Sequence, residues 1–289
     1  MSQISYKPVS DKEMPFSDLH CHSNCSDGEL SPAELVQRAF DRQIEVFALT
    51  DHDTVAGLSQ ARIKAAELGI HFINGTELTC LSGKQVVHIV GLGFDDQNPQ
   101  LIDYLERLVV LRNERACIIA ERLIKKGCPD LLEQAKALSG GGQVGRPHFA
   151  QAMVEAGVVN NEMQAFNRYL GAGKAGDVKV EWPAMHLGIQ CIKQAGGITV
   201  LAHPTKYKLT FTKIRLMVEA FSNAGGDALE ISYPGVESGH MVQLDRLVDK
   251  YNLMVSAGSD FHKTSFHWTD LGKYPKIDTV NTHVLQSLL

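Results

Sequence analysis

The sequence predicts an α/β fold, a barrel-like sheet with a helical insertion, from three observations. Short apolar strands alternate with helices over residues 1–97. A mostly helical stretch without a convincing strand covers residues 98–184, and the alternation resumes over residues 185–289. Alternating strands and helices form a mainly parallel sheet with helices packed against it. We therefore expect a barrel in two parts, residues 1–97 and 185–289, with residues 98–184 inserted as a cap over the substrate.

The first part of the barrel is expected to contain four strands. They are residues 16–22, 46–53, 70–78 and 85–94. After the first strand, Ser31, Pro32 and Glu34 have the spacing of a capping box with proline at the first helical position, so a helix should begin there. The alanine-rich helix between the second and third strands should end at Gly69.

The insertion should begin with one long helix, and shorter helices should follow it. The three helical segments are residues 98–127, 146–157 and 161–171. The second part of the barrel then adds three strands and a helix, residues 240–252. The strands are residues 197–204, 227–234 and 253–262. The tail after Lys273 shows no clear pattern.

The composition of the chain argues against a membrane protein, a secreted protein and a protein that coats nucleic acid. The chain has 289 residues, a formal net charge of −5 and 44% hydrophobic residues. No apolar run approaches the ~18 residues of a membrane span, and the N-terminus has no basic-then-apolar signal pattern. The six cysteines include no Cys-x-x-Cys pair, so reduced thiols are expected. We expect a cytoplasmic protein that does not coat nucleic acid nonspecifically, although the mild acidity allows a local basic pocket.

Polar residues cluster near the ends of the predicted strands. Nine of them are His20, His22, Asp27, His52, Glu77, His88, His203, Asp260 and His262. All but His88 lie at or just past the C-terminal end of a strand, and in parallel α/β barrels these ends converge on one face. His20 and His22 should point to the same side of the first strand, with Cys21 pointing away. Six histidines and three carboxylates on one face predict a metal site suited to Mn²⁺, Fe²⁺, Zn²⁺ or Mg²⁺.

Several neighbouring residues are expected to have only structural roles. Asp53 should cap the helix that follows it, and Cys21 and Cys25 should be small packing residues. Taken alone, His88 is better explained as a core histidine than as a ligand. The cluster as a whole, and not any single residue, therefore predicts the metal site.

Six short segments occur in a fixed order along the chain: DLHCHSNCSDG, TDHD, GTEL, HIVGL, LAHP and GSDFH. They resemble the successive motifs of the polymerase and histidinol phosphatase family of metal-dependent phosphoesterases. The resemblance implies a distorted seven-stranded (β/α) barrel. It also implies three divalent ions, with Mn²⁺ the first candidate, held by the nine residues named above. In this family pattern Glu77 bridges two ions.

The insertion resembles one branch of that family through LRNERACIIAERL, GRPHFA and FNRYLGAGK. This branch contains nucleoside 3′,5′-bisphosphate phosphatases and 5′-to-3′ exoribonucleases of the ribonuclease AM type. Arg112 and Arg115 share one helix face, Arg146 lies in a glycine-flanked turn, and Lys174 lies in a glycine-rich loop. Because guanidinium groups bind phosphate bidentately, these four residues are the expected clamp for a substrate phosphate. Asp177 stands where the family often has tyrosine, so contacts to the base or sugar are expected to differ.

Together these features predict hydrolysis of the 3′ phosphate ester in a nucleotide that carries a 5′ phosphate. The expected substrates are nucleoside 3′,5′-bisphosphates such as adenosine 3′,5′-bisphosphate (pAp), short single-stranded 5′-monophosphorylated RNA cut from its 5′ end, or both. Hydroxide that bridges the metal ions is the expected nucleophile. The open alternatives are a histidinol-phosphate phosphatase, a polymerase-associated proofreading domain and a non-catalytic metal-binding domain. No protein partner is predicted.

Overall fold

The computed structural model describes residues 14–265 and 268–289, which contain a seven-stranded sheet. The strands are β1 (Ser17–Asp18), β2 (Val46–Leu49), β3 (His71–Ser82), β4 (Gln85–Leu92), β5 (Ile198–Leu201), β6 (Ala228–Ser232) and β7 (Met254–Ala257). Each strand pairs with the next in chain order. Just past β1 and β7, an isolated bridge between Cys21 and Phe261 nearly closes the sheet. The expected distorted seven-stranded barrel is confirmed, whereas the N-terminal residues 1–13, in which no signal pattern was found, lie outside the described residues.

The sheet is mainly parallel, as expected, with one antiparallel strand. Strands β1 to β3 pair in parallel, as do β5 to β7, but β4 runs antiparallel to both β3 and β5. Strand β3 continues to Ser82 and turns back into β4 through Gly83, whose φ is 61°. Glu77 therefore lies inside β3 and not at a strand end. Strand β1 is shorter than expected, so His20 and His22 follow it outside the strand, where the His22 N–H donates to the Phe261 carbonyl at 2.9 Å.

Helices pack against the outside of the sheet. They are α1 (Pro32–Asp41), α2 (Leu58–Leu68), α7 (Met185–Gln194), α8 (Phe211–Asn223) and α9 (Ser238–Tyr251). Helix α1 begins at the expected capping box, in which the Ser31 hydroxyl accepts from the Glu34 backbone N–H and the Glu34 carboxylate accepts from the Ser31 N–H. Helix α2 ends at Gly69 in the left-handed conformation, with φ 73°. Leu35 of α1 and Ile189 of α7 are fully buried in the core between helices and sheet.

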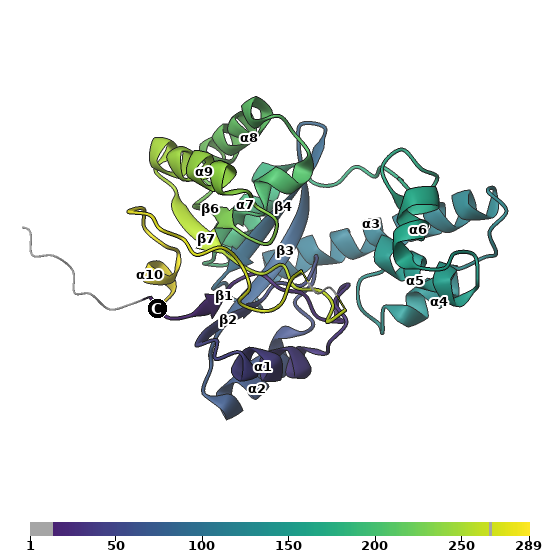
Figure 1. Ribbon diagram of the computed structural model, residues 1–289, viewed down its shortest axis with the longest axis horizontal. Coiled ribbons are helices and arrows are strands. Elements are labelled where there is room, and N and C mark those ends of the chain that lie inside the picture. Colours follow the sequence, from purple (N-terminus) through teal and green to yellow (C-terminus); the bar gives the residue numbers. More distant parts are fainter. Residues whose placement is uncertain (1–13, 266–267) are drawn as a thin grey trace, which may run out of the picture.

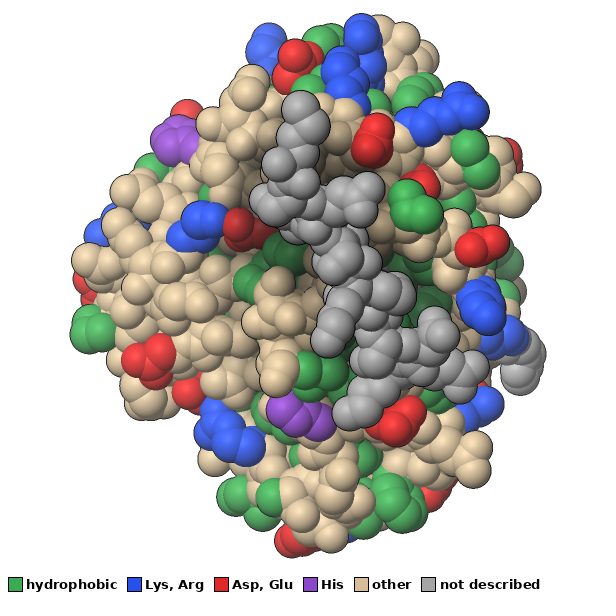
Figure 2. Space-filling model, turned by 90° about the vertical axis from the view of Figure 1, so that its left-hand side faces the viewer, with side chains coloured by type: hydrophobic (Ala, Val, Ile, Leu, Met, Phe, Trp, Pro, Cys, Tyr) green, Lys and Arg blue, Asp and Glu red, His purple; other side chains and the backbone are tan. Residues whose placement is uncertain are grey.

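The interior of the barrel is a separate apolar cluster. Leu19, Ala48 and Val200 are buried in it. Val284 and the short helix α10 (Leu285–Leu288) join the same cluster and cover one end of the barrel. The C-terminal tail thus contributes to the core, although a four-residue helix left no recognisable pattern in the sequence. Figure 2 shows the face nearest this end, where acidic and basic side chains are interspersed.

The insertion has a core of its own. Its helices are α3 (Pro99–Ile124), α4 (Leu132–Leu138), α5 (Arg146–Glu155) and α6 (Glu162–Ala165), followed by a π-helical turn (Phe166–Leu170). Figure 1 shows α4, α5 and α6 grouped at one end of the molecule, joined to the barrel by α3. Leu101 and Leu108 of α3 belong to the barrel core, whereas Ile119 and Leu123 belong to the core of the insertion. The first part of α3 thus packs in the barrel and its last part packs in the insertion. The predicted domain boundary at residue 98 stays a prediction.

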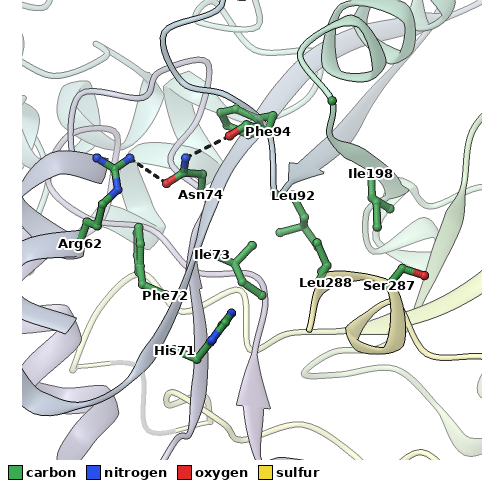
Figure 3. A pocket seen from close by; sticks show the side chains of 12 residues that line it. Arg62, His71, Phe72, Ile73, Asn74, Leu92, Phe94, Ile198, Ser287 and Leu288 are labelled. Atoms are coloured by element: carbon green, nitrogen blue, oxygen red, sulfur yellow. Dashed lines mark hydrogen bonds between the residues drawn. The ribbon is translucent and has the colours of Figure 1, made fainter. Parts of the chain in front are cut away.

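A pocket of about 400 Å³ lies at the end of the barrel where β3 begins and β4 finishes (Figure 3). Two of its polar side chains, Arg62 and Asn74, are already paired. Arg62 donates to Asn74 Oδ1 at 2.9 Å and to Asp96 Oδ2 at 2.8 Å, and the Asn74 amide donates to the Phe94 carbonyl at 3.0 Å. This pocket is distant from the polar cluster at the opposite strand ends. Among the described helices, none is both long and apolar enough to cross a membrane.

Candidate metal centre

The chain leaving β1 carries the first two histidines to the mouth of the barrel. Cys21 faces β2, because its backbone N–H donates to Thr50 Oγ1 at 3.0 Å and its Sγ lies 3.2 Å from the Ala48 carbonyl. His20 and His22, on either side of Cys21, are both buried at the centre. The expected alternation of side chains is therefore present, although these residues lie beyond the paired strand.

Two sets of contacts fix the chain around His20 and the loop that follows His22. At Gly258, just past β7, an added Cβ would collide with His20, so only glycine allows the approach of β7 to the His20 backbone. Buried Asp51 accepts hydrogen bonds from the Ser23 N–H at 2.7 Å, the Ser23 hydroxyl at 2.6 Å and the Ser26 hydroxyl at 2.7 Å. These bonds order the loop that presents Asp27 next to His262.

Glu77 lies fully buried at the middle of the cluster, and five histidines surround its carboxylate. They are His20, His22, His52, His88 and His203, whose nearest ring nitrogens lie 2.9–3.3 Å from the Glu77 oxygens. These histidines come from four segments that are far apart in the sequence, because His20 and His22 share one of them. Antiparallel pairing of β3 with β4 brings His88 to the same face as Glu77. One carboxylate is thus shared by many potential metal ligands.

The two other carboxylates lie on either side of this group. Asp260 Oδ1 is 3.3 Å from His22 Nε2 and 3.7 Å from His20 Nε2. Asp27 Oδ1 is 3.3 Å from His262 Nε2 and 3.9 Å from His52 Nε2. The structure therefore brings all nine residues singled out in the sequence into one continuous cluster.

The donor atoms fit divalent metal ions. Ligands bonded at about 2.1 Å to a tetrahedral or octahedral ion lie roughly 3.0–3.4 Å apart, close to the separations above. Within the part of the chain that the structure describes, seven buried side-chain nitrogen and oxygen atoms have no hydrogen-bond partner, and all belong to this cluster. They come from His20, His22, Asp27, His52, Glu77 and His203. Buried polar atoms in folded proteins are almost always paired, so these atoms indicate a bound group that the polypeptide itself does not supply.

The protonation states differ across the cluster. Burial would lower the pKa of His20, His52 and His262, but neighbouring carboxylates raise it, so metal must displace protons from these rings. Glu77 and His22, in contrast, already have the forms that bind metal. Burial would raise the pKa of Glu77, but His88, His52 and His20 hold it well below its usual range. Burial, together with the nearby His262 and His52, lowers the pKa of His22 to about 3. An ionised carboxylate and a neutral imidazole are the forms that coordinate metal ions.

Backbone strain is concentrated at the same place. Within the described residues, six non-glycine residues have positive φ, and three of these are Asp53 (53°), His203 (29°) and Asp260 (47°). Such conformations cost about 1–3 kcal/mol each and persist where function requires them. Two of the three residues are candidate ligands, so the strain aims their side chains at the centre.

Comparisons with known proteins decide the family. A family model described as PHP domain matches residues 18–170, more than half of the chain. The chain belongs to the PHP domain family. It is 43% identical over 89% of its length to a 5′-3′ exoribonuclease of Haemophilus influenzae, covering 93% of that protein. It is 36% identical over 88% of its length to a 3′,5′-nucleoside bisphosphate phosphatase of Chromobacterium violaceum, covering 90% of that protein.

The PHP fold is also supported by a solved structure. It is described as an amidohydrolase from Chromobacterium violaceum with bound sulfate and no metal, and it superposes with a TM-score of 0.87 and 34% identity. The match covers 94% of this chain and 95% of the other. The family and the enzyme class predicted from the sequence, a phosphoric ester hydrolase, are confirmed.

Behind the metal centre of this PHP barrel lies a carboxylate that sequence reasoning missed. Glu230 Oε1 is 2.9 Å from His20 Nδ1, and Glu230 Oε2 accepts from the His203 backbone N–H at 2.7 Å. A buried carboxylate bound to the second nitrogen of a ligating histidine fixes its ring orientation and tautomer. A charged residue in the middle of the apolar strand β6 was the available signal, because such a residue is seldom buried without partners.

We expect Glu230→Gln to weaken Mn²⁺ binding about tenfold or more, because the amide cannot hold His20 as the carboxylate does. Titration of metal-free protein with Mn²⁺ by calorimetry measures this. Glu237→Gln is the matched control, since the Glu237 side chain is 81% exposed. Equal affinities in the Glu230 variant and the wild type would contradict the positioning role.

Arg112 is not free to act as an open phosphate clamp. Its Nε donates to Asp53 Oδ2 at 2.7 Å, and its Nη2 donates to Thr79 Oγ1 at 3.1 Å. Asp53 is fully buried and also accepts from the Thr79 backbone N–H at 2.6 Å. The expectation that Asp53 only caps the next helix is therefore wrong, because its carboxylate joins the insertion to β3. Arg112 stays a candidate for binding a substrate phosphate only through the N–H groups that these hydrogen bonds do not use.

Arg115 and Arg146 lie beside Arg112 and are less fully paired. Arg115 Nε donates to the Val178 carbonyl at 3.1 Å, and Arg146 Nη1 donates to the Leu170 carbonyl at 3.2 Å. Burial, and then the charges of Arg146 and Arg112, lower the pKa of Arg115 to about 10. Three guanidinium groups are thus close enough to repel one another, which favours an anion between them.

Asp177 and Lys174 occupy the glycine-rich loop next to these arginines. The Asp177 carboxylate accepts from the Gly173 N–H at 2.8 Å and lies 4.0 Å from Arg146 Nη1. Asp177 therefore offsets part of the positive charge of Arg112, Arg115 and Arg146, which we call the arginine group. It stands where the family resemblance implied a tyrosine. Lys174 is exposed in the same loop.

The insertion contacts the loop that carries Asp27. The Gln143 N–H donates to the Cys25 carbonyl at 3.1 Å. Lys263, adjacent to His262, pairs with Glu162 of α6 at 2.6 Å. Cys25 thus packs at the junction between insertion and barrel. Arg112, bonded to Asp53 next to His52, lies beside the candidate metal ligands.

Proposed function

We propose that this protein is a metal-dependent phosphoesterase that hydrolyses the 3′ phosphate ester of nucleotides carrying a 5′ phosphate. The observation that best supports the proposal is the shared carboxylate of Glu77, which five histidines surround. Arg112, with Arg115 and Arg146 near it, is joined to the same face of the barrel through Asp53 and Thr79. Donor atoms fall into overlapping groups of three or four that meet at Glu77, His20, His22 and His52. This overlap supports more than one ion, and we assign the nine residues as ligands of three, with Mn²⁺ as the preferred metal.

The residues of this chain hold and orient the reactants. When bound, divalent ions activate water and offset negative charge on phosphoryl oxygens. Glu77 joins neighbouring sites, while Asp260 and Asp27 complete the donor set on either side. Since three carboxylates balance only part of the charge of three divalent ions, the centre retains positive charge and attracts a phosphate ester.

Arg115 and Arg146, with the remaining donors of Arg112 and with Lys174 nearby, are proposed to bind the 5′ phosphate. Binding energy from this remote phosphate helps to orient the reacting one. Both pAp and short single-stranded 5′-monophosphorylated RNA present phosphates on the two sides of one ribose. The names of the relatives from Haemophilus influenzae and Chromobacterium violaceum support these two substrate types.

A panel of substrates tests this function. Mn²⁺-loaded protein should release phosphate from pAp and nucleotides from 5′-monophosphorylated RNA, and it should process histidinol phosphate much more slowly. Chelation of the metal should stop all three reactions. A preference for histidinol phosphate would select the alternative phosphatase, and no hydrolysis of pAp or of the RNA would contradict the proposed function.

A further inference from the structure

The chain after β5 forms a rigid turn at the rim of the metal centre. This turn is the 3₁₀ helix η2 (Pro204–Tyr207). The Tyr207 hydroxyl accepts from a backbone N–H of β4 at 2.8 Å, and the Thr205 N–H donates to the Tyr233 hydroxyl at 3.0 Å. Lys206 lies between these two anchored residues, so its side chain leaves from a fixed backbone.

The Lys206 ammonium contacts the cluster through its outer carboxylate. Lys206 Nζ lies 2.5 Å from Asp260 Oδ2, while the other oxygen of Asp260 faces His22 Nε2 at 3.3 Å. Nζ also lies 5.7 Å from the centre of the Tyr233 ring. The Lys206 side chain is still 34% exposed. The ammonium is therefore one carboxylate away from the metal donors and open to the solvent side.

A salt bridge to Asp260 does not by itself explain the position of the Lys206 ammonium once metal ions are bound. Divalent ions next to Asp260 already offset its charge, so the lysine would add a further positive charge beside the ions. Like charges at such distances repel one another unless an anion joins them. An ammonium has three N–H donors, and Asp260 Oδ2 accepts only one. Donor capacity and positive charge therefore remain for an anion on the open side.

We propose that Lys206 is a further catalytic residue, whose ammonium contacts a non-bridging oxygen of the scissile phosphate. This assignment rests on the proposed function, because it requires a phosphate ester seated on the centre. Lys206 acts by its charge and not as a proton donor. It offsets negative charge where that charge accumulates during attack on phosphorus.

Binding of inorganic phosphate to the Mn²⁺-loaded protein tests the contact directly. By calorimetry, Lys206→Ala should weaken phosphate binding about tenfold, and it should lower kcat/KM by at least as much on both pAp and p-nitrophenyl phosphate. Lys206→Arg should recover part of both losses. Metal content by elemental analysis should equal that of the wild type in each variant. Lys213→Ala, at an exposed lysine of α8, is the matched control.

Two results would overturn the proposal. Unchanged phosphate affinity in Lys206→Ala, with full metal content, would show that the ammonium does not reach the phosphate. Loss of one metal equivalent would instead make Lys206 a positioning residue for Asp260. A wild type that binds phosphate but hydrolyses no nucleotide would count against the proposed function alone, because phosphate binding reports on Lys206 separately.

Discussion

Glu77→Ala should remove phosphate release from every ester that the wild type hydrolyses. Glu77 is fully buried, and its two oxygens face ring nitrogens of five histidines. Its loss removes the one acid shared between the donor groups, so more than one ion should be lost with it. Because metal ions supply several kcal/mol of transition-state stabilisation, kcat/KM should fall about a thousandfold or more. Steady-state hydrolysis of p-nitrophenyl phosphate measures this effect.

Two further variants serve as comparisons for Glu77→Ala. One removes the charge but keeps the side-chain size, and the other removes an unrelated glutamate. Glu77→Gln keeps the side-chain volume but removes the negative charge, and we expect it to be nearly as inactive as the alanine variant. Glu67→Ala changes a glutamate of α2 whose side chain is 59% exposed, and it should behave as the wild type. If Glu77→Ala kept more than about a tenth of the wild-type activity, a shared carboxylate could not be central to catalysis.

Removal of the 5′ phosphate from the substrate should lower kcat/KM at least about tenfold. Charge-assisted hydrogen bonds contribute roughly 1.5–3 kcal/mol, and the arginine group offers several of them. The comparison is between pAp and adenosine 3′-monophosphate, each measured with wild-type protein. Equal kcat/KM values would exclude a 5′ phosphate clamp and would favour the histidinol-phosphatase alternative.

Arg115→Ala and Arg146→Ala test the same clamp from the protein side. Each should reduce hydrolysis of pAp about tenfold and leave p-nitrophenyl phosphate unchanged, because the latter has no second phosphate. Arg168→Ala is the control, since this exposed arginine lies in the insertion but over the ring of Tyr169. Arg112→Ala is a poorer probe. It would leave Asp53 buried without its partner, which destabilises the fold as well.

Much of the metal centre could be predicted from the sequence because it follows strand ends. His52, His203 and Asp260 each lie two or three residues after an apolar strand, and the barrel order brings such positions together. The strand over residues 85–94 was predicted, but its antiparallel direction was not, because the sequence indicates two buried strands without showing how they pair. The placement of Glu77 inside β3 follows from that pairing and had no separate signal.

The remaining features depend on contacts between distant residues. Arg112 meets Asp53 only because α3 packs across the barrel, and no local pattern links positions 59 residues apart. The left-handed backbone of His203 and Asp260 also leaves no mark in the sequence, since glycine is the usual residue there. Glu230 was recognisable as a charge in an apolar strand, but its role required the geometry of His20 and His203.

The number of divalent ions per chain tests the central claim most directly. Wild-type protein loaded with Mn²⁺, desalted and analysed for metal should contain more than one ion per chain and approach three. The nine ligands, Glu77 included, would then bind metal together, and Glu77→Ala should contain at least two fewer ions. A fully active wild type with one ion per chain or fewer would contradict the account.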